Sequence, residues 1–290
     1  MELCLGTAQF GMNYGIQGGK KIAYTEAFEI LDYALKNGIT TLDTASGYGN
    51  AETIIGDYIA DKTDGFKIIS KLPFELFKNL TETDYLEKAI SSLEESLELL
   101  KSYKLHGLLL HNTAYLYDEN AMNALLFLKE AGYTDSIGVS VYDPKDAFYA
   151  LELGLDLIQI PANLFDRRFD PFLESAASKM KVYVRSVFLQ GLLLMDPDEV
   201  TNKLPIASEY VKSFDQISKD SGFTRRELAL AYIKRKKGIS SLVFGVDSLL
   251  QLQENIAAFH KQVPDQIIDE ISTQFVNINE DIISPLKWKN

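Results

Sequence analysis

Short apolar runs alternate with longer amphipathic segments along the whole chain. The short runs are rich in leucine and β-branched residues, which is typical of buried parallel strands, and the longer ones space their apolar residues as a helix does. In TEAFEILDYALKNG, for example, Phe28, Leu31 and Leu35 share one helical face, and Asn37 and Gly38 supply a stop. The runs predict strands at residues 3–6, 39–43, 67–71, 105–110, 136–140, 155–160, 181–185 and 240–244.

Eight strand–helix units in 290 residues predict a (β/α)8 TIM barrel, a fold that typically takes about 250 residues. A doubly wound open sheet is the alternative. The longest stretch without a clear strand, residues 191–237, contains the turn-rich MDPDEVTNKLP, so we expect a long loop plus an extra helix there. No shift in composition marks a boundary, and residues 1–290 are therefore predicted to form one domain.

Composition and charge narrow the function classes. The chain is 46% apolar and 24% charged, as ordinary globular domains are. Its formal net charge of −12 disfavours binding to nucleic acid or to anionic lipid. Cys4 is the one cysteine, so no intrachain disulfide can form, and no apolar window is long enough to span a bilayer. These features, with an amino terminus that lacks a signal-peptide pattern, predict a cytoplasmic protein.

Polar side chains follow three successive predicted strands, at the end where such a barrel carries its chemistry. Asp43 ends the second strand, with Tyr48 five residues further on, Lys71 ends the third, and His111 follows the fourth. Consecutive strands are adjacent in this barrel, so the four side chains should face the same space at the carboxyl ends of the strands. We expect Lys71, kept charged by Asp43, to lower the pKa of Tyr48 from its usual value near 10. Taken singly, each of the four is more often structural.

In motifs that run in the family's order along nearly the whole chain, the sequence resembles the aldo-keto reductases. GTAQFG at residues 6–11 is similar to the family's opening strand and loop, and Asp43, Tyr48, Lys71 and His111 fall on its catalytic tetrad. IGVSVY, IQIPANLFDR, RSVFLQGLLL and VFGVDSLLQLQENIAAF resemble the cofactor-binding motifs of strands five to eight. The resemblance implies that Tyr48 gives a proton to a substrate carbonyl as hydride arrives from the cofactor. Lys71, held by Asp43, would tune the tyrosine, and His111 would orient the carbonyl oxygen.

The same resemblance implies NADP(H) or NAD(H) as the cofactor. In the family, polar residues of strands five and six bind the nicotinamide carboxamide, the loop after strand seven covers the pyrophosphate, and the last strand and helix clasp the adenosine end. No metal is expected, because the three histidines form no zinc-like spacing with each other or with the cysteine. The implied cofactor-binding residues are Gly6, Thr7, Asp43, Ser140, Gln159, Arg185, Ser186, Phe188, Gln190, Gly191, Gly245, Asp247, Ser248, Gln251, Glu254 and Asn255.

Some of these positions depart from the family's usual pattern. Val141 stands where asparagine usually follows the serine of strand five, which removes one hydrogen bond to the cofactor. Arg185 stands where an aromatic residue usually stacks on the nicotinamide, so it could stack there, clamp a carboxylate or phosphate of the substrate, or form a structural ion pair. Asp247 and Gln251 stand where NADP-binding members usually carry basic residues, which makes NAD use or dual use credible. Both cofactors stay open, and the family's general use of NADPH slightly favours the phosphorylated one.

Two other function classes stay open. A nucleotide-binding sensor or accessory protein of the same fold, with negligible turnover, would fit the changes at Val141 and Arg185. A barrel aldolase would use Lys71 as a Schiff-base nucleophile. Tyr48, five residues after a strand-end aspartate, favours reductase chemistry over the aldolase. The oligomeric state is not predicted.

The predicted partner is a small-molecule carbonyl compound whose identity the sequence does not reveal. If Arg185 or Arg167 reaches the space at the carboxyl ends of the strands, we expect an anionic substrate. This would be an acidic or phosphorylated carbonyl compound, such as one derived from a sugar. The loop residues that are candidates for lining the substrate pocket are Met12, Tyr14, Tyr115, Tyr117, Phe165 and Arg167.

Overall fold

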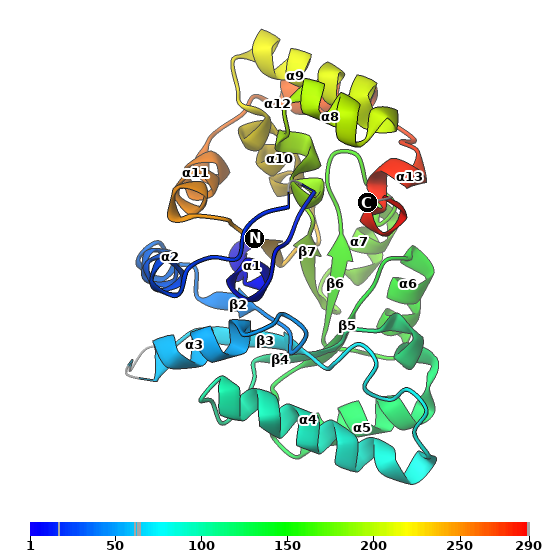
Figure 1. Cartoon of the computed structure of the whole chain (residues 1–290). Helices are drawn as coiled ribbons and strands as arrows, with labels where there is room; N and C mark the ends of the chain where they lie inside the picture. The colour runs from blue at the N-terminus through cyan, green and yellow to red at the C-terminus, as the bar shows by residue number, and fades with distance from the viewer. Residues whose placement is uncertain (17, 61, 63–64, 289–290) are drawn as a thin grey trace.

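Eight parallel strands close into a barrel in the computed structural model, which describes residues 1–16, 18–60, 62 and 65–288 (Figure 1). The strands are β1 Glu2–Gly6, β2 Thr41–Asp43, β3 Lys67–Lys71, β4 Gly107–Leu110, β5 Ile137–Ser140, β6 Leu157–Pro161, β7 Lys181–Arg185 and β8 Ser241–Phe244. Each strand pairs with its neighbours in chain order, and β8 returns to pair with β1. The predicted (β/α)8 barrel is confirmed, and the open-sheet alternative is wrong because β1 is hydrogen-bonded on both sides.

The predicted strands differ from the observed ones by at most two residues at either end. β3 and β7 have the predicted bounds, whereas β2, β4 and β6 begin two residues late. Ile39 and Leu155 are buried, as the pattern indicates, but their N–H groups donate to the preceding helices. Ile39 bonds to the Ala34 carbonyl at 3.0 Å and Leu155 to the Ala150 carbonyl at 3.2 Å. Apolar residues therefore mark where burial begins, slightly before strand pairing does.

Helices surround the barrel (Figure 1). They are α1 Ala8–Gly11, α2 Tyr24–Lys36, α3 Ala51–Ile59, α4 Tyr85–Leu99, α5 Glu119–Glu130, α6 Pro144–Glu152, α7 Asp170–Ala176, α8 Pro197–Lys203, α9 Ser208–Ser221, α10 Arg225–Lys234, α11 Leu249–His260, α12 Asp265–Gln274 and α13 Glu280–Ile283. Short 3₁₀ turns are η1 Glu82–Asp84, η2 Thr113–Tyr117, η3 Leu189–Leu194, η4 Pro205–Ala207 and η5 Pro285–Lys287. In Figure 1, α8, α9 and α12 lie together at the top of the view.

The stretch 191–237 corrects one prediction, because it is mostly helical and holds α8, α9 and α10 where we expected a long loop with one extra helix. The turn-forming residues of MDPDEV serve as a helix start. The Asp196 carboxylate accepts from the Asp198 N–H, and Pro197 occupies the first turn of α8. Further on, Thr224 and Glu227 form a reciprocal capping box that starts α10.

In α2 the buried face is displaced from the predicted one. Phe28 and Leu35 are only partly covered, and Phe28 meets the ring of Tyr58 in α3 edge-on at 5.3 Å between ring centres. Small side chains let the helix approach the barrel closely, and Asn37 and Gly38 end it as predicted, with Gly38 at φ +78°. The fully buried residues of α2 are Ala27, Ile30, Leu31 and Ala34.

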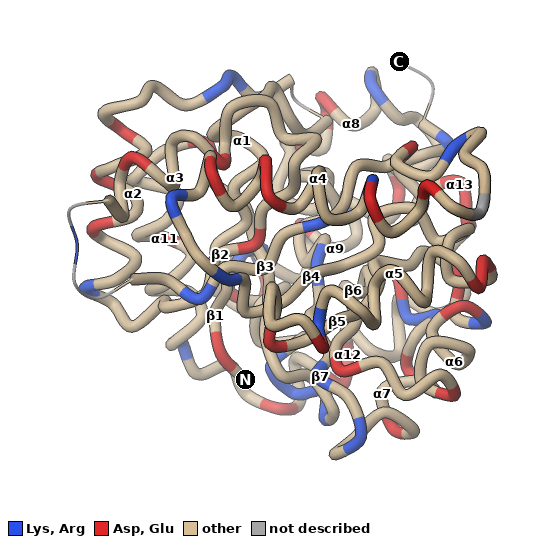
Figure 2. The backbone as a smooth tube through the Cα atoms, turned by 90° about the horizontal axis from the view of Figure 1, so that it is seen from below, with Lys and Arg blue, Asp and Glu red and all other residues tan. Residues whose placement is uncertain are grey.

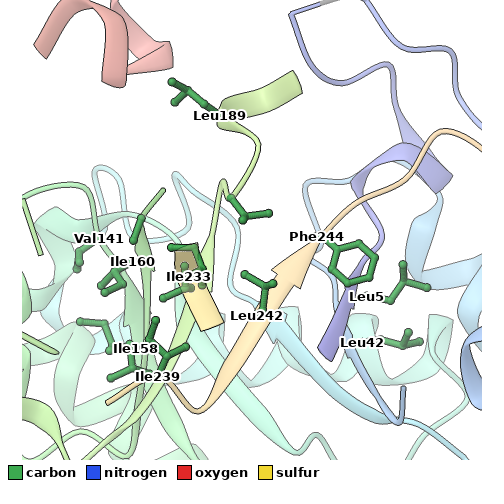
Figure 3. Packing of buried hydrophobic residues seen from close by; sticks show 14 of the residues in the cluster. Leu5, Leu42, Val141, Ile158, Ile160, Leu189, Ile233, Ile239, Leu242 and Phe244 are labelled. Carbon is green, nitrogen blue, oxygen red and sulfur yellow. The ribbon is translucent and has the colours of Figure 1, made fainter. Parts of the chain in front are cut away.

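The apolar core has two layers, because side chains of a strand alternate between its faces. The outer layer lies between strands and helices. Figure 3 shows part of it, including Leu5, which pairs in register with Leu42 of β2 and Phe244 of β8. The inner layer fills the barrel with Cys4, Ile69, Leu109, Leu157, Tyr183 and Val243. The strands therefore enclose a packed interior, on which the polar residues at their carboxyl ends rest.

Charged residues cover the outer helices, with both signs interspersed in the view of Figure 2. Acidic residues exceed basic ones by 41 to 29, so the surrounding field is negative. Among the described residues, no helix combines the length and the apolar character needed to cross a bilayer.

Candidate active site

Register places Asp43, Lys71 and His111 at the carboxyl ends of three adjacent strands. Asp43 pairs with Ile69 of β3, and Lys71 comes two residues after that partner. Lys71 in turn pairs with Leu109 of β4, and His111 comes two residues after it. Residues two apart in a strand point to the same face, so all three polar side chains rise on one side of the barrel end.

Asp43 and Lys71 form a buried ion pair. Nζ of Lys71 lies 2.7 Å from Oδ1 of Asp43 and donates to the Thr44 carbonyl at 2.8 Å. The amide of Gln159 also donates to the Asp43 carboxylate, and the Thr7 hydroxyl donates to the Asp43 carbonyl at 3.0 Å. Asp43 is 6% and Lys71 3% exposed, so each charge depends on the other for compensation.

Tyr48 lies in the turn after β2, packed against the first loop. A Cβ atom on Gly11, the last residue of α1, would overlap the Tyr48 carbonyl oxygen, so this position requires glycine. Nζ of Lys71 lies 5.1 Å from the centre of the Tyr48 ring, and the His111 ring meets it edge-on with the centres 6.2 Å apart. The structure thus brings Asp43, Tyr48, Lys71 and His111 together.

The acidity of Tyr48 corrects a prediction. Burial raises the pKa of its hydroxyl above the usual value near 10, and the Asp43 carboxylate adds to the rise. The Lys71 charge, the Lys71 hydrogen bond and the Arg185 charge lower this pKa without cancelling the increase. The expected net lowering is wrong because the sequence reveals the ammonium but not the desolvation. Tyr48 is consequently a protonated phenol at neutral pH.

Lys71 is a charged ammonium and not a free amine. Burial alone would lower its pKa, but the charges of Asp43 and Tyr48 and hydrogen bonds to both raise it above the usual range. A Schiff-base nucleophile has to be unprotonated when it attacks a carbonyl. The geometry therefore disfavours the aldolase interpretation.

His111 is neutral at physiological pH. Burial and the nearby charge of Lys71 lower its pKa from 6.5 to about 4. Phe74 covers it on another side, edge-on at 5.8 Å between ring centres. Its buried Nδ1 has no hydrogen-bond partner among the described residues. A neutral imidazole beside a phenol can orient a carbonyl oxygen without adding a second positive charge to that of Lys71.

A cavity of about 320 Å³ opens beside Tyr48. We call Asp43, Tyr48 and Arg185 its barrel end, and Arg226, Asp247, Gln251 and Asn255 its outer end. The residues predicted to bind a cofactor that line this cavity are Gly6, Thr7, Asp43, Arg185, Ser186, Phe188, Gln190, Gly191, Gly245, Asp247, Gln251 and Asn255. Ser140, Gln159, Ser248 and Glu254 do not line it.

Each of those four residues has contacts within the protein. Ser140 and Gln159 are register partners on β5 and β6, and both are buried. Gln159 donates to Asp43, while its own buried Oε1 has no partner among the described residues. Ser248 caps α11 by accepting from the Gln251 N–H at 3.2 Å. Glu254 forms an ion pair with Arg226 at 2.7 Å.

The loop after β7 curves around the cavity through left-handed backbone. Ser186, Leu189 and Gln190 have φ of 64°, 49° and 53°, and Gly191 has 96°. The first loop crosses over to it, because the Ile16 N–H donates to the Gln190 carbonyl at 3.1 Å. Within the loop, the Leu189 N–H donates to the Ser186 carbonyl at 2.8 Å and the Gly191 N–H to the Phe188 carbonyl at 2.9 Å, so the turns are held by the loop's own hydrogen bonds.

Several lining residues were missed by sequence reasoning. Most of them lie inside the motifs already identified, next to predicted residues, so taking each motif as a whole would have found them. Arg226 is different, because it lies on α10, within the stretch predicted as a long loop plus an extra helix, where no motif marks it. The missed lining residues are Ala8, Gln9, Gly15, Gly19, Val187, Leu194, Arg226, Val243 and Phe244.

At the outer end, Arg226 donates to Asn255 and pairs with Glu254, and its guanidinium lies 5.8 Å from the centre of the Phe188 ring. Gln251 holds Asp247 by accepting from its N–H at 2.9 Å. This end therefore carries one guanidinium and the carboxylate of Asp247, and Glu254 outside the lining pairs with the guanidinium.

Of the substrate-pocket candidates, only Tyr14 lines the cavity within the described residues. Its hydroxyl accepts from Gln190 at 3.3 Å. Arg167 does not line the cavity, because its guanidinium donates to the carbonyls of Ser272 at 2.6 Å, Ile271 at 3.1 Å and Leu164 at 3.3 Å. Met12, Tyr115, Tyr117 and Phe165 lie outside the cavity as well.

No cluster of three or more histidine, cysteine, aspartate or glutamate side chains in the described part of the chain is arranged to hold a metal ion.

Comparisons with known proteins place this barrel among enzymes. The sequence model of the Aldo/keto reductase family matches residues 2–274. The chain is 26% identical to the oxidoreductase YqkF of Bacillus subtilis (strain 168), over 80% of this chain and 82% of that protein. It is 25% identical to the aldo-keto reductase YhdN of the same organism, over 89% and 86% of the two chains. In three dimensions, a thermostable aldo-keto reductase solved with the inhibitor epalrestat superposes with a TM-score of 0.69, at 22% identity over 93% of this chain and 94% of that one.

Proposed function

This chain belongs to the aldo/keto reductase family, and on that premise we propose that it reduces an aldehyde or ketone to an alcohol with NADPH or NADH. The observation that carries the proposal is the position of Tyr48, a protonated phenol between the Lys71 ammonium and the neutral His111, at one end of a cavity. Such a group can give its proton to a carbonyl oxygen bound against it.

Each neighbour of Tyr48 has a distinct task in this proposal. Lys71 stabilises the phenolate that forms as the proton leaves, and Asp43 keeps Lys71 charged and oriented. His111 directs the carbonyl oxygen toward the phenol and stays neutral while doing so. Because the raised pKa makes Tyr48 a weak acid in its resting state, the Lys71 charge acts mainly as the negative charge develops.

The residues present fit a nicotinamide dinucleotide. The unpartnered Oε1 of Gln159 is a buried acceptor next to Asp43, suited to a carboxamide N–H. The loop after β7 lines the cavity with Ser186, Gln190 and Gly191 and would lie along the pyrophosphate, and Asn255, Gln251 and Asp247 would hold the adenosine. When bound, a reduced nicotinamide supplies the hydride for the carbonyl carbon.

The choice between NADPH and NADH rests on the outer end. Asp247 repels a 2′-phosphate and can accept from a free ribose hydroxyl. Arg226 offers a cation, but Glu254 already neutralises it at 2.7 Å. We propose that both nucleotides bind, through a balance of charges and not through a dedicated phosphate pocket.

Tyr48→Phe tests the proposal directly. We expect turnover of a panel of aldehydes to fall by roughly 10²- to 10⁴-fold, the contribution of a positioned proton donor. Nucleotide affinity, followed by fluorescence, should change by less than about twofold, because the hydroxyl acts on the substrate. Tyr133→Phe is the matched control, since that hydroxyl bonds to Glu94 on the protein surface.

Unchanged turnover in Tyr48→Phe would refute the assigned acid. Tight nucleotide binding without turnover by the unaltered protein would support a sensor or accessory protein instead. We further propose a cytoplasmic location and a small-molecule carbonyl substrate, supported by the single buried Cys4 and by a cavity of about 320 Å³ beside Tyr48.

A further inference from the structure

Among the described residues, Arg185 and Arg167 are the arginines without an acidic partner, and of the two only Arg185 lines the cavity. Among the described residues, no aspartate or glutamate oxygen lies within 4.0 Å of its guanidinium, and Arg167 bonds to carbonyls away from the cavity. The arginines that do have such a partner are Arg168, Arg225, Arg226 and Arg235. The structural ion pair considered for Arg185 is therefore absent from the described part of the chain.

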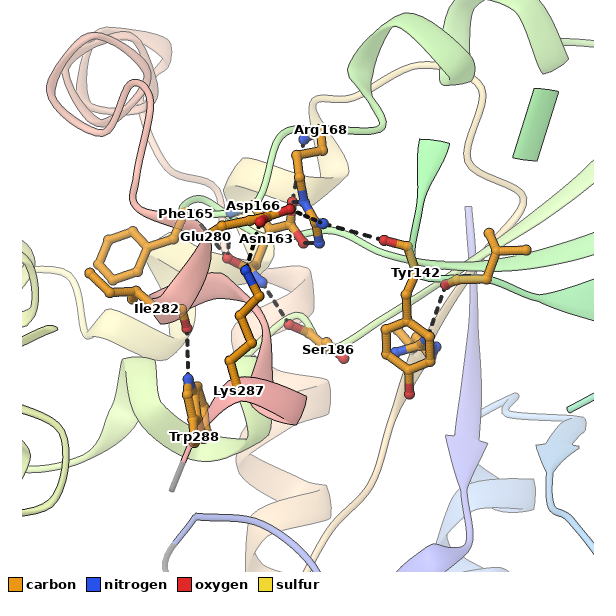
Figure 4. A network of polar contacts seen from close by, with 12 residues as sticks. Tyr142, Asn163, Phe165, Asp166, Arg168, Ser186, Glu280, Ile282, Lys287 and Trp288 are labelled. Atoms are coloured by element: carbon orange, nitrogen blue, oxygen red, sulfur yellow. Dashed lines mark hydrogen bonds and ion pairs between the residues drawn. The ribbon is translucent and has the colours of Figure 1, made fainter. Parts of the chain in front are cut away.

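The guanidinium of Arg185 is held in place nonetheless. Its Nη2 donates to the Val141 carbonyl at 3.0 Å, and its Cζ lies 4.1 Å from the centre of the Tyr142 ring. Arg168 donates to the Tyr142 carbonyl at 3.3 Å and is itself paired with the fully buried Asp166 (Figure 4). The contacts fix one edge and one face of the guanidinium, which leaves most of its five N–H donors unused by the described residues.

This cation lies close to the reacting end of the cavity. Arg185 and Tyr48 line the same space, and the Arg185 charge helps to lower the pKa of both Tyr48 and His111. In a chain of net charge −12, an anion would approach this site only if a local cation offset the overall field. A preorganised, unpaired guanidinium provides such an offset.

We propose that Arg185 anchors an anionic group of the substrate, so that the preferred substrates are carbonyl compounds carrying a carboxylate or a phosphate. This inference rests on the proposed carbonyl reduction and adds the substrate class. Arg185 holds the anion while the carbonyl oxygen faces Tyr48 and His111. The planar fork of the guanidinium suits both kinds of anion, which it binds through paired N–H donors.

Arg185→Gln tests this with matched pairs of aldehydes. One pair is 4-carboxybenzaldehyde and its methyl ester, and the other is glyceraldehyde 3-phosphate and glyceraldehyde. We expect the ratio of kcat/KM for the anionic over the neutral member to fall by roughly 10- to 100-fold, the worth of a charge-assisted hydrogen bond. Arg185→Lys should keep an intermediate ratio, because a point charge remains without the fork. The pair that loses its preference identifies carboxylate or phosphate as the anion.

Arg235→Gln is the matched control, because it removes the same charge from the surface, where Arg235 pairs with Asp269. It should leave both ratios unchanged. A wild-type ratio near one for both pairs would overturn the proposal. So would an Arg185→Gln variant that loses anionic and neutral activity equally or binds the nucleotide much more weakly, since Arg185 would then serve the cofactor.

A binding measurement separates this inference from the proposed activity. Calorimetric titration with 4-(hydroxymethyl)benzoate, the alcohol that carboxybenzaldehyde would yield, requires no turnover. Binding at least about tenfold weaker in Arg185→Gln, with no change for benzyl alcohol, would support the anchor even if no aldehyde were reduced. Turnover of neutral aldehydes with no effect of Arg185→Gln on this titration would refute the anchor and leave the reductase proposal intact.

Discussion

The two ends of the cavity are built in opposite ways. At the barrel end, Asp43 and Lys71 are almost completely buried and satisfied by one another. At the outer end, Arg226 and Glu254 form a partly exposed pair, with side chains 22% and 45% exposed. The strands position the first pair, whereas two neighbouring helices, α10 and α11, position the second.

The difference shows where rigidity is needed. A proton donor has to stand within a fraction of an ångström of its target, and strand ends locked by a buried ion pair supply that precision. Recognition at the far end of a long ligand tolerates more movement, so solvent-exposed charges on helices suffice. Stability should therefore depend strongly on the charges of one end and weakly on those of the other.

Removing the cation at each end gives the largest contrast. Lys71→Met leaves Asp43 buried without its counter-charge, and we expect the free energy of unfolding to fall by about 3–5 kcal/mol. Arg226→Met should cost less, about 1–3 kcal/mol, because water screens the exposed Glu254 and the main loss is the hydrogen bond to the buried Asn255. Urea denaturation of both variants measures the difference. Equal losses would contradict the comparison, and adding Asp43→Asn to Lys71→Met should restore part of the stability.

Acid should weaken the barrel end through His111. The folded protein keeps this imidazole neutral down to about pH 4, whereas the unfolded chain protonates it near pH 6.5. The unfolded state thus binds more protons in this window, and stability declines as pH falls through it. We expect wild type to lose about 2–3 kcal/mol more than His111→Gln between pH 6.5 and pH 4. Urea denaturation of both proteins at several pH values measures these losses. If wild type and His111→Gln lost the same unfolding free energy over this pH range, the imidazole would not be buried in its neutral form.

At the outer end, the smallest effect concerns nucleotide choice. Asp247→Asn removes an exposed negative charge from the side of the cavity where the adenosine should bind. NADPH should then bind about three- to tenfold more tightly relative to NADH, the size expected for one screened charge at short range. Fluorescence titration with both nucleotides measures the ratio. An unchanged ratio would place the 2′ position away from Asp247.

Sequence reasoning reached the barrel end more readily than the outer end. Asp43, Lys71 and His111 follow buried apolar runs, and the register of a closed barrel brings such residues together. Arg226 has no comparable signal. It lies in an ordinary helix, α10, and no family motif covers this part of the sequence.

The pKa of Tyr48 and the availability of each arginine for a ligand could not be predicted from the sequence. The pKa of Tyr48 depends on how completely the neighbouring loops cover it, and no local pattern states that. The sequence alone does not distinguish Arg167 from Arg185 as an anion-binding residue. The guanidinium of Arg167 donates to two carbonyls of α12, which lies about a hundred positions further along the chain. Tertiary partners of this kind decide which arginine is free to meet a ligand.

The contact between Gly11 and the Tyr48 carbonyl has a practical consequence for redesign. A graft that widens the entrance by replacing the first loop would also have to supply a residue without a side chain at position 11. Otherwise the turn bearing the phenol would be pushed aside and its alignment lost. The two loops are best exchanged together, as a single cassette.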